Sequence, residues 1–255
     1  MVRVAIVCAY DGSGFRGFAR QQGLRTVQGE IEGALERLAR DPIVTVGAGR
    51  TDSGVHARHQ VLHADVPERI AAEPPALCRR LQAITGRDLT VYAVSGVSKE
   101  FDARFSALER CYHYLVDDRP FPDPLLRHTV AAWPHPVSVS RMRAGAKTLL
   151  GTHDFSAFCR PRPGQSLVRE VRRLAIERRE GLVSFRVDAN AFLHQMVRRV
   201  VGLLLEVGDG YREPEEVAEV LEGKDRSRSS RIAHPEGLTL IEVRYPARFH
   251  IPSPL

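Results

Sequence analysis

One carboxylate, Asp52, has the setting of a reactive group. It lies between Gly49 and Gly54, two residues after Arg50, and the segment comes shortly after the apolar run 43–46. Glycines on both sides permit a tight turn and the close approach of a ligand. A carboxyl with an ordinary pKa of ~3.9 is ionised at neutral pH, and a neighbouring guanidinium holds it ionised and fixes its direction. Asp52 is therefore a candidate nucleophile at the end of a strand, although the same fragment alone also fits an ordinary aspartate in a glycine turn.

A second constellation suggests metal chemistry. His56, His59 and His63 have the spacing i, i+3 and i+7, which would place all three on one face of a helix. Further ligands could come from a carboxylate and imidazole set, namely Asp52, Asp65, His153 and Asp154. A metal-dependent hydrolase is thus one alternative. Against it, residues 60–66 alternate as a strand, which would separate His56 and His59 onto opposite faces.

Composition narrows the class of protein. The 255 residues are 43% hydrophobic, enough for a sizeable core, and no apolar run is long enough to span a membrane. The beginning of the chain has no secretory signal, so we expect a cytoplasmic protein. The four cysteines form no closely spaced pair and are expected to be buried thiols.

Basic residues outnumber acidic ones. Lysine and arginine together number 37, against 31 for aspartate and glutamate, and only three of the cations are lysines. Arginine suits phosphate and bases, but genome composition or heat adaptation would explain the same excess.

Hydrophobic periodicity predicts one α/β unit over residues 1–100 and a second over 101–255. In the first unit we expect strands at 2–10, 43–46, 59–66 and 88–95, a helix capped by Thr26 with the stripe Val27, Ile31, Leu35 and Leu38, and a helix at 75–85. In the second unit we expect strands at 105–116, 168–178, 182–188 and 238–244, and helices at 138–150, 191–207 and 214–222. Asn190 is the expected cap of the helix 191–207, and Glu180-Gly181 the expected hairpin turn.

The segment Gly49-Arg-Thr-Asp-Ser-Gly-Val-His resembles the signature of the A-type tRNA pseudouridine synthases, in which the aspartate is the nucleophile. The resemblance continues in order along nearly the whole chain. It covers Tyr10-Asp-Gly-Ser, Phe101-Asp-Ala-Arg-Phe-Ser-Ala, Arg110-Cys-Tyr-His-Tyr, Asp154-Phe-Ser-Ala-Phe, Asn190-Ala-Phe-Leu-His-Gln-Met-Val-Arg and Pro235-Glu-Gly-Leu. Several ordered motifs are far more specific than any one of them.

The resemblance implies an α+β protein with the pseudouridine synthase fold, in which two α/β units with mixed or antiparallel sheets surround a central basic cleft. It implies that uridine is flipped out of the RNA and isomerised without a metal or any other cofactor. Attack at C1′, attack at C6 and elimination to a glycal all stay open. The implied partner is tRNA, held by a homodimer, and the implied targets are uridines 38, 39 and 40 of the anticodon stem-loop.

Roles for individual residues also come from the resemblance. Asp52 is the implied nucleophile, Tyr112 the platform that stacks on the base, and Arg198 the arginine that pairs with the nucleophile. Arg50 is expected to contact phosphate or to occupy the space of the flipped base, and three further arginines are candidates for RNA backbone contacts: Arg16, Arg20 and Arg58. Each role has a purely structural alternative. Tyr112 could be a half-buried tyrosine of a strand. Arg198 could be a solvated arginine, although that description fits Arg199 better.

Three positions depart from the family pattern. Phe18 stands where tryptophan is usual, which could alter RNA contacts. Ser53 stands where alanine is common, and Cys111 where a basic residue often precedes the tyrosine.

A further alternative to the enzyme is a non-catalytic RNA-binding module on a sheet with exposed aromatic side chains. That alternative leaves the Arg50-Thr-Asp52 segment unexplained.

Overall fold

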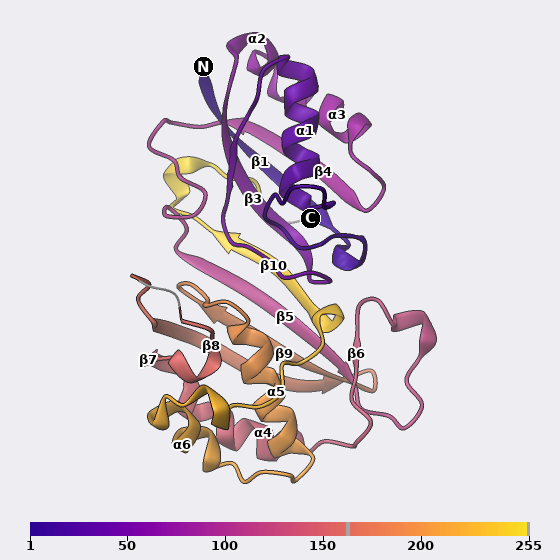
Figure 1. Cartoon of the computed structure of the whole chain (residues 1–255), viewed down its shortest axis with the longest axis vertical. Helices are drawn as coiled ribbons and strands as arrows, with labels where there is room; N and C mark the ends of the chain where they lie inside the picture. Colours follow the sequence, from indigo (N-terminus) through magenta and orange to yellow (C-terminus); the bar gives the residue numbers. More distant parts are fainter. Residues whose placement is uncertain (162–163, 254–255) are drawn as a thin grey trace. The chain divides into compact units, whose positions relative to one another are not determined.

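The chain divides into two compact units in a computed structural model that describes residues 1–161 and 164–253 (Figure 1). The first unit comprises residues 1–108 and 239–255, and the second comprises residues 109–238. The sequence division at residue 100 assigns the whole C-terminal part to the second unit, whereas in the structure residues 239–253 pack with the first.

The first unit is built on a mixed sheet. Its strands are β1 (Val2–Tyr10), β2 (Thr45–Gly47), β3 (His56–Val66), β4 (Leu89–Gly96) and β10 (Leu238–Arg244). They are ordered β4-β1-β3-β10, with β2 also paired to β3. β1 runs antiparallel to both of its neighbours, and β10 runs parallel to β3. The central strands β1 and β3 are buried along most of their length, as expected of strands covered on both faces.

Three helices belong to the first unit, namely α1 (Val27–Ala39), α2 (Glu68–Ala71) and α3 (Pro74–Ile84). The predicted cap is confirmed, because the Thr26 hydroxyl accepts a hydrogen bond from the Gly29 amide at 3.2 Å. Val27, Ile31 and Leu35 of the predicted apolar stripe are fully buried. α1 and α3 pack against each other (Figure 1), and α3 also packs on β4. The helix α2 was not predicted.

The second unit has its own sheet. Its strands are β5 (Glu109–Asp117), β6 (Ala131–Ala132), β7 (Gly151–Asp154), β8 (Val168–Arg179) and β9 (Leu182–Ala189). The order is β5-β9-β8-β7 with antiparallel pairing, and the short β6 pairs parallel with β5. The predicted hairpin is confirmed: Glu180 and Gly181 join β8 to β9 with φ values of 51° and 81°. Positive φ at both positions suits a two-residue hairpin turn.

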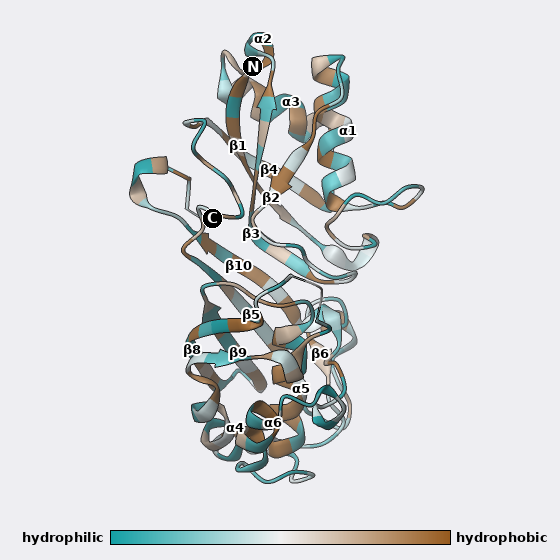
Figure 2. Ribbon diagram, turned by 60° about the vertical axis from the view of Figure 1, so that its left-hand side comes forward, coloured by the Kyte–Doolittle hydropathy of each residue, from teal (hydrophilic) through white to brown (hydrophobic). Residues whose placement is uncertain are grey.

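The helices of the second unit are α4 (Val139–Ala146), α5 (Met196–Gly208) and α6 (Glu216–Gly223). α4 packs on α5, α6 and β8. Apolar and polar residues alternate in bands along the ribbons (Figure 2), and the apolar residues of α5 are almost all buried. Short 3-10 turns occur at Gly12–Gly14, Pro124–Leu126, Lys147–Leu149, Ser156–Phe158, Arg226–Arg228, Pro235–Gly237 and Ala247–Phe249. Within the described residues, no helix is both long and apolar enough to cross a bilayer.

Two predicted boundaries are wrong for local reasons. α5 begins at Met196 rather than after Asn190, because the Asn190 side chain accepts from the amides of Ala191 and Glu170 and so ties the chain to β8. β5 begins at Glu109 rather than at residue 105, because residues 102–106 form a hydrogen-bonded turn.

Candidate active site

The Asp52 loop, residues 48–55, connects β2 to β3 in the first unit. The amide of Val55 donates to the Asp52 carbonyl at 3.2 Å, and Gly54 has a φ of 81°. This closes a tight turn that leaves the Asp52 side chain half-buried. The carboxylate is thus at a turn between two strands, as the glycine spacing predicted.

The N-terminal loop, residues 11–19, packs against the Asp52 loop. The Phe18 amide donates to the Thr51 carbonyl at 3.0 Å, and the Ser53 hydroxyl donates to the Phe15 carbonyl at 3.0 Å. Gly17 has a φ of +92°, and a Cβ there would lie 3.2 Å from the Thr51 carbonyl oxygen. A larger residue would therefore be strained and would also press on the backbone beside Asp52.

Buried polar side chains hold the Asp52 loop from beneath. The hydroxyls of Tyr10 and Thr51 are 2.8 Å apart, and the Gln60 side-chain amide donates to the Gly49 carbonyl at 2.8 Å. The same Gln60 nitrogen is 3.3 Å from the Tyr10 hydroxyl. These contacts fix the loop on both sides of Arg50. The supporting role of these three side chains could not be predicted from periodicity or motif spacing; the available signal was a hydroxyl residue directly before the candidate nucleophile.

The three histidines serve the fold of the first unit. His56 Nδ1 accepts from the Gly12 amide and His63 Nδ1 from the Ala103 amide, each at 3.0 Å. His59 Nδ1 accepts from the Val243 amide at 3.0 Å, and its Nε2 is 2.9 Å from the Pro252 carbonyl. Burial lowers the pKa of His59 and of His63, which keeps these rings neutral.

The metal-dependent hydrolase is not favoured by this arrangement. β3 has the strand geometry that separates His56 from His59. In the part of the chain that the structure describes, no metal-binding group of three or more side chains includes these histidines. Each of them is used to bind backbone amides.

The candidate RNA-contacting arginines of the first unit differ in their surroundings. Arg50, Arg16 and Arg58 are exposed. Arg20 is also exposed, but its Nη1 is 3.1 Å from Glu32 and 3.0 Å from Glu36. Its charge is thus largely matched within the protein, which makes it the least suitable of the four for a phosphate.

Phe18 does not present a surface for RNA. The side chain is 2% exposed, and a Cβ on Gly47 would lie 2.3 Å from its ring. The departure from the usual tryptophan therefore changes packing beside the Asp52 loop rather than an exposed contact.

Tyr112 lies on β5 of the second unit. It is 7% exposed and meets Phe192 edge to face, with ring centroids 5.1 Å apart and an interplanar angle of 90°. Tyr114, two residues on, donates from its hydroxyl to the His234 carbonyl at 2.7 Å. The packing of Tyr112 is thus that of a buried strand tyrosine, and its stacking role stays a prediction of the resemblance.

Two adjacent arginines lie in the first turn of α5. Arg198 is half-buried and donates from Nε to the Ala233 carbonyl at 2.7 Å. Arg199 is 7% exposed and donates from Nη1 to the Ser229 hydroxyl at 2.8 Å and to the Ser230 carbonyl at 3.3 Å. The expectation of a solvated Arg199 is therefore wrong, because its guanidinium anchors the segment 229–230 to α5.

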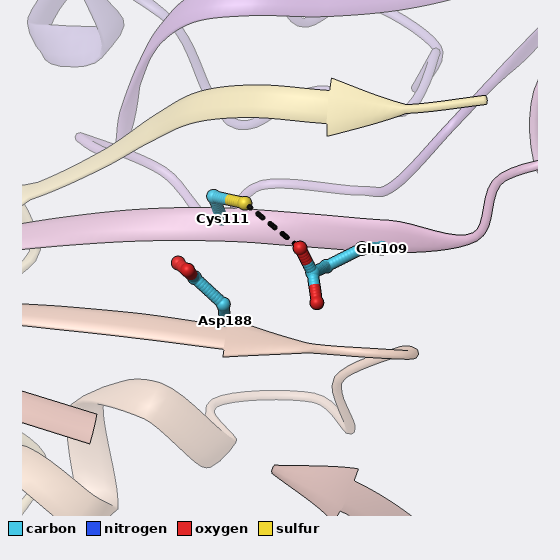
Figure 3. Close-up of side chains that lie close together, drawn as sticks. All are labelled: Glu109, Cys111 and Asp188. Carbon is cyan, nitrogen blue, oxygen red and sulfur yellow. Dashed lines mark hydrogen bonds between the residues drawn. The ribbon is translucent and has the colours of Figure 1, made fainter. Parts of the chain in front are cut away.

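Glu109, Cys111 and Asp188 form a buried group on β5 and β9 (Figure 3), with potential ligand atoms all within 4.8 Å of one another. The Cys111 thiol is 3.7 Å from Glu109 Oε2. The carboxylates already face cations: Arg172 is 3.4 Å from Glu109, and Arg186 is 3.2 Å from Asp188. A metal ion would have to compete with both guanidinium groups, so we assign these residues to an internal ion-pair network.

The predicted catalytic set is divided between the units. Asp52 and Arg50 belong to the first, and Tyr112 and Arg198 to the second. The convergence of these four residues on one substrate stays a prediction of the resemblance.

Comparison with known proteins identifies the class. A family model described as tRNA pseudouridine synthase matches residues 146–246. A protein of Frankia casuarinae called tRNA pseudouridine synthase A is 47% identical over 249 residues, covering 96% of this chain and 90% of the relative. Proteins with the same description are 44% identical over 253 residues in Streptomyces griseus (96% and 89% covered) and 38% identical over 256 residues in Coxiella burnetii (99% and 96% covered).

A mixed α/β fold and sequence identity of this extent over nearly the whole chain define an RNA-modifying isomerase of the pseudouridine synthase class. Within that class, the chain belongs to the tRNA pseudouridine synthase A family.

Proposed function

We propose that this protein converts uridine to pseudouridine in the anticodon stem-loop of tRNA, at positions 38, 39 and 40, with Asp52 as the nucleophile. The reaction breaks the N1–C1′ bond, turns the base and joins C5 to C1′. The proton lost from C5 is balanced by the proton gained at N1, so no oxidant, reductant or group donor is consumed. A carboxylate suits this chemistry because it can form a covalent bond and then leave.

The observation that carries the proposal is the support of the Asp52 loop. Backbone contacts from the N-terminal loop and side-chain contacts from Tyr10 and Gln60 hold the residues around Asp52 from two sides. A nucleophile must be held close to its productive position, since small displacements cost large factors in rate. An ordinary surface aspartate has no need of such support.

Residues of the second unit would complete the site. Tyr112 would stack on the flipped uracil, and base stacking is worth about 1–3 kcal/mol, which offsets part of the cost of extruding the base. Arg198 would pair with the Asp52 carboxylate and keep it ionised. Arg50 would contact a phosphate or take the place of the flipped base, and Arg16 and Arg58 would contact the RNA backbone. We further propose that the enzyme acts as a homodimer in the cytoplasm.

Mapping of pseudouridine in an unmodified tRNA transcript tests the proposal. Treatment with the wild-type protein should give pseudouridine at positions within 38–40, and treatment with Asp52→Asn should give none. The Asn variant should bind the transcript with nearly unchanged affinity, since the substitution preserves shape. Product formed elsewhere in the tRNA would refute the assignment of the target, and no product from the wild type would refute the function.

A further inference from the structure

Phe105 is a large apolar side chain that the fold leaves in solvent. It is 79% exposed, and it belongs to the segment 101–107, whose motif has no role in the chemistry proposed above. The Arg104 guanidinium lies over its ring, 5.3 Å from the ring centroid. The exposed ring thus carries a cation over one of its two faces.

A closed set of hydrogen bonds shapes the turn that carries them. Asp102 Oδ1 accepts from the amides of Arg104 and Phe105, each at 2.8 Å. The Asp102 amide donates to the Ser106 hydroxyl at 3.0 Å, and the Ser106 amide donates to the Asp102 carbonyl at 2.9 Å. An aspartate that binds the amides two and three residues ahead defines the backbone of a turn. The backbone conformation at Phe105 is therefore set by contacts within the turn.

The base of the turn is anchored in the first unit. Phe101 is fully buried, with its ring centroid 5.1 Å from Tyr245, 5.1 Å from Phe249 and 6.2 Å from His63. Ala103 is held on both of its backbone groups, since its amide donates to His63 Nδ1 at 3.0 Å and its carbonyl accepts from the Tyr245 hydroxyl at 2.6 Å. A turn fixed in this way loses little conformational freedom when a ligand binds.

We propose that Phe105 and Arg104 form a contact site for an unpaired nucleotide of the RNA substrate, in which the base stacks on the Phe105 ring and Arg104 binds the adjacent phosphate. The proposal rests on the proposed function in one respect, that the substrate is RNA. A nucleotide offers a planar face and an anionic group within one residue, which matches an aromatic ring beside a guanidinium. Stacking is tolerant of sequence, so such a site would help to hold tRNAs that differ in their bases.

The competing occupant is a second copy of this chain, since an exposed aromatic residue also suits a protein interface. The pairing with arginine favours RNA, because a protein partner would have to bring both an apolar surface and a carboxylate to the same turn. Phosphate supplies the anion at every nucleotide.

Binding of an unmodified tRNA transcript to four variants tests the site. Phe105→Ala should weaken binding by about 5- to 150-fold. Phe105→Trp keeps an aromatic face and should stay within about threefold of the wild type. Arg104→Ala should reduce the slope of log affinity against log salt concentration by about 1, the amount expected for one lost phosphate contact. The matched control is Phe121→Ala in the second unit, which removes a 90% exposed phenylalanine and should leave affinity unchanged.

The oligomeric state of each variant, measured without RNA by analytical ultracentrifugation, separates the two occupants. Under the proposal, Phe105→Ala sediments as the wild type does. Wild-type affinity of Phe105→Ala, or a changed oligomeric state in the absence of RNA, would overturn the proposal. Circular dichroism confirms folding, and a variant that unfolds is replaced by Phe105→Ser. Failure of the proposed function would look different, because the wild type itself would then form no pseudouridine.

Discussion

The Tyr10 hydroxyl meets the Thr51 hydroxyl at 2.8 Å in the interior of the first unit. Tyr10 is the last residue of β1, and Thr51 directly precedes the proposed nucleophile. The hydrogen bond therefore joins the end of a central strand to the loop that carries Asp52. Rigid strands are better supports for a catalytic group than free loops, and here the loop takes its position from the strand.

Gly17→Ala should disturb this support. Gly17 has a φ of +92°, and a Cβ would lie 3.2 Å from the Thr51 carbonyl oxygen. We expect a loss of stability of about 1–3 kcal/mol and a fall in turnover of at least tenfold, measured by denaturant unfolding and by pseudouridine formation. Gly23→Ala is the matched control, since Gly23 also has a positive φ of +72° but no atom within 4 Å of its Cβ position. Equal loss of turnover in both variants would show that backbone strain, not contact with the Asp52 loop, is responsible.

Stability should depend on the titration of His63. Burial lowers the pKa of its ring, and this effect outweighs the nearby carboxylates of Asp102 and Asp65, which raise it. Below the ordinary pKa of ~6.5 the unfolded chain takes up a proton that the folded ring resists, so stability falls as the pH drops from 7.5 toward 5. Protonation would also remove the Nδ1 acceptor of the Ala103 amide.

The test for His63 is His63→Asn, which keeps an acceptor near the Nδ1 position but does not titrate. The free energy of unfolding of this variant should fall less steeply between pH 7.5 and 5 than that of the wild type. His59, whose pKa burial also lowers, should account for part of the slope that remains. Identical slopes for the variant and the wild type would contradict the assignment.

Arg199→Met should destabilise the second unit. The variant keeps most of the side-chain volume but removes the hydrogen bonds to Ser229 and Ser230, for an expected loss of about 1–3 kcal/mol. Arg231→Met is the control, because Arg231 is exposed in the same segment and its replacement should change stability by less than about 0.5 kcal/mol. Denaturant unfolding of both variants measures the difference, and equal effects would mean that Arg199 is not an anchor.

Tyr112→Phe separates stacking from proton transfer. The ring and its edge-to-face contact with Phe192 are retained, so tRNA affinity should stay within about threefold of the wild type. Tyr112→Ala, in contrast, should weaken binding and lower stability by about 3–5 kcal/mol. The single-turnover rate of Tyr112→Phe then reports on the hydroxyl: an unchanged rate would exclude a role in removing the C5 proton.

Much of the fold could be predicted from the sequence because apolar periodicity reflects burial. The stripe of α1, its Thr26 cap and the turn at Glu180 and Gly181 all follow from local rules. The start of α5 could not be predicted by such rules, because the Asn190 side chain accepts hydrogen bonds from the amides of Ala191 and Glu170 instead of capping a helix. That choice depends on β8, which is distant in sequence.

The candidate site shows the same division. The glycine spacing around Asp52 predicted a turn, and the resemblance supplied its chemistry. The residues that hold the turn, such as Tyr10 and Gln60, could not be found by periodicity, since they act through hydrogen bonds formed only when β1 and β3 pair. The burial of Arg199 could not be predicted for a related reason, since its hydrogen-bond partner Ser229 lies 30 residues away in a segment without regular structure.

Release of tritium from tRNA labelled at C5 of uridine tests the central claim most directly, because the new bond between C5 and C1′ replaces the bond from C5 to hydrogen. With the wild type, release should keep pace with pseudouridine formation. With Asp52→Asn, release should be abolished while tRNA binding is nearly intact. Release by Asp52→Asn at more than about a tenth of the wild-type rate would contradict the assignment of Asp52 as the nucleophile, since loss of a covalent catalyst costs far more than tenfold.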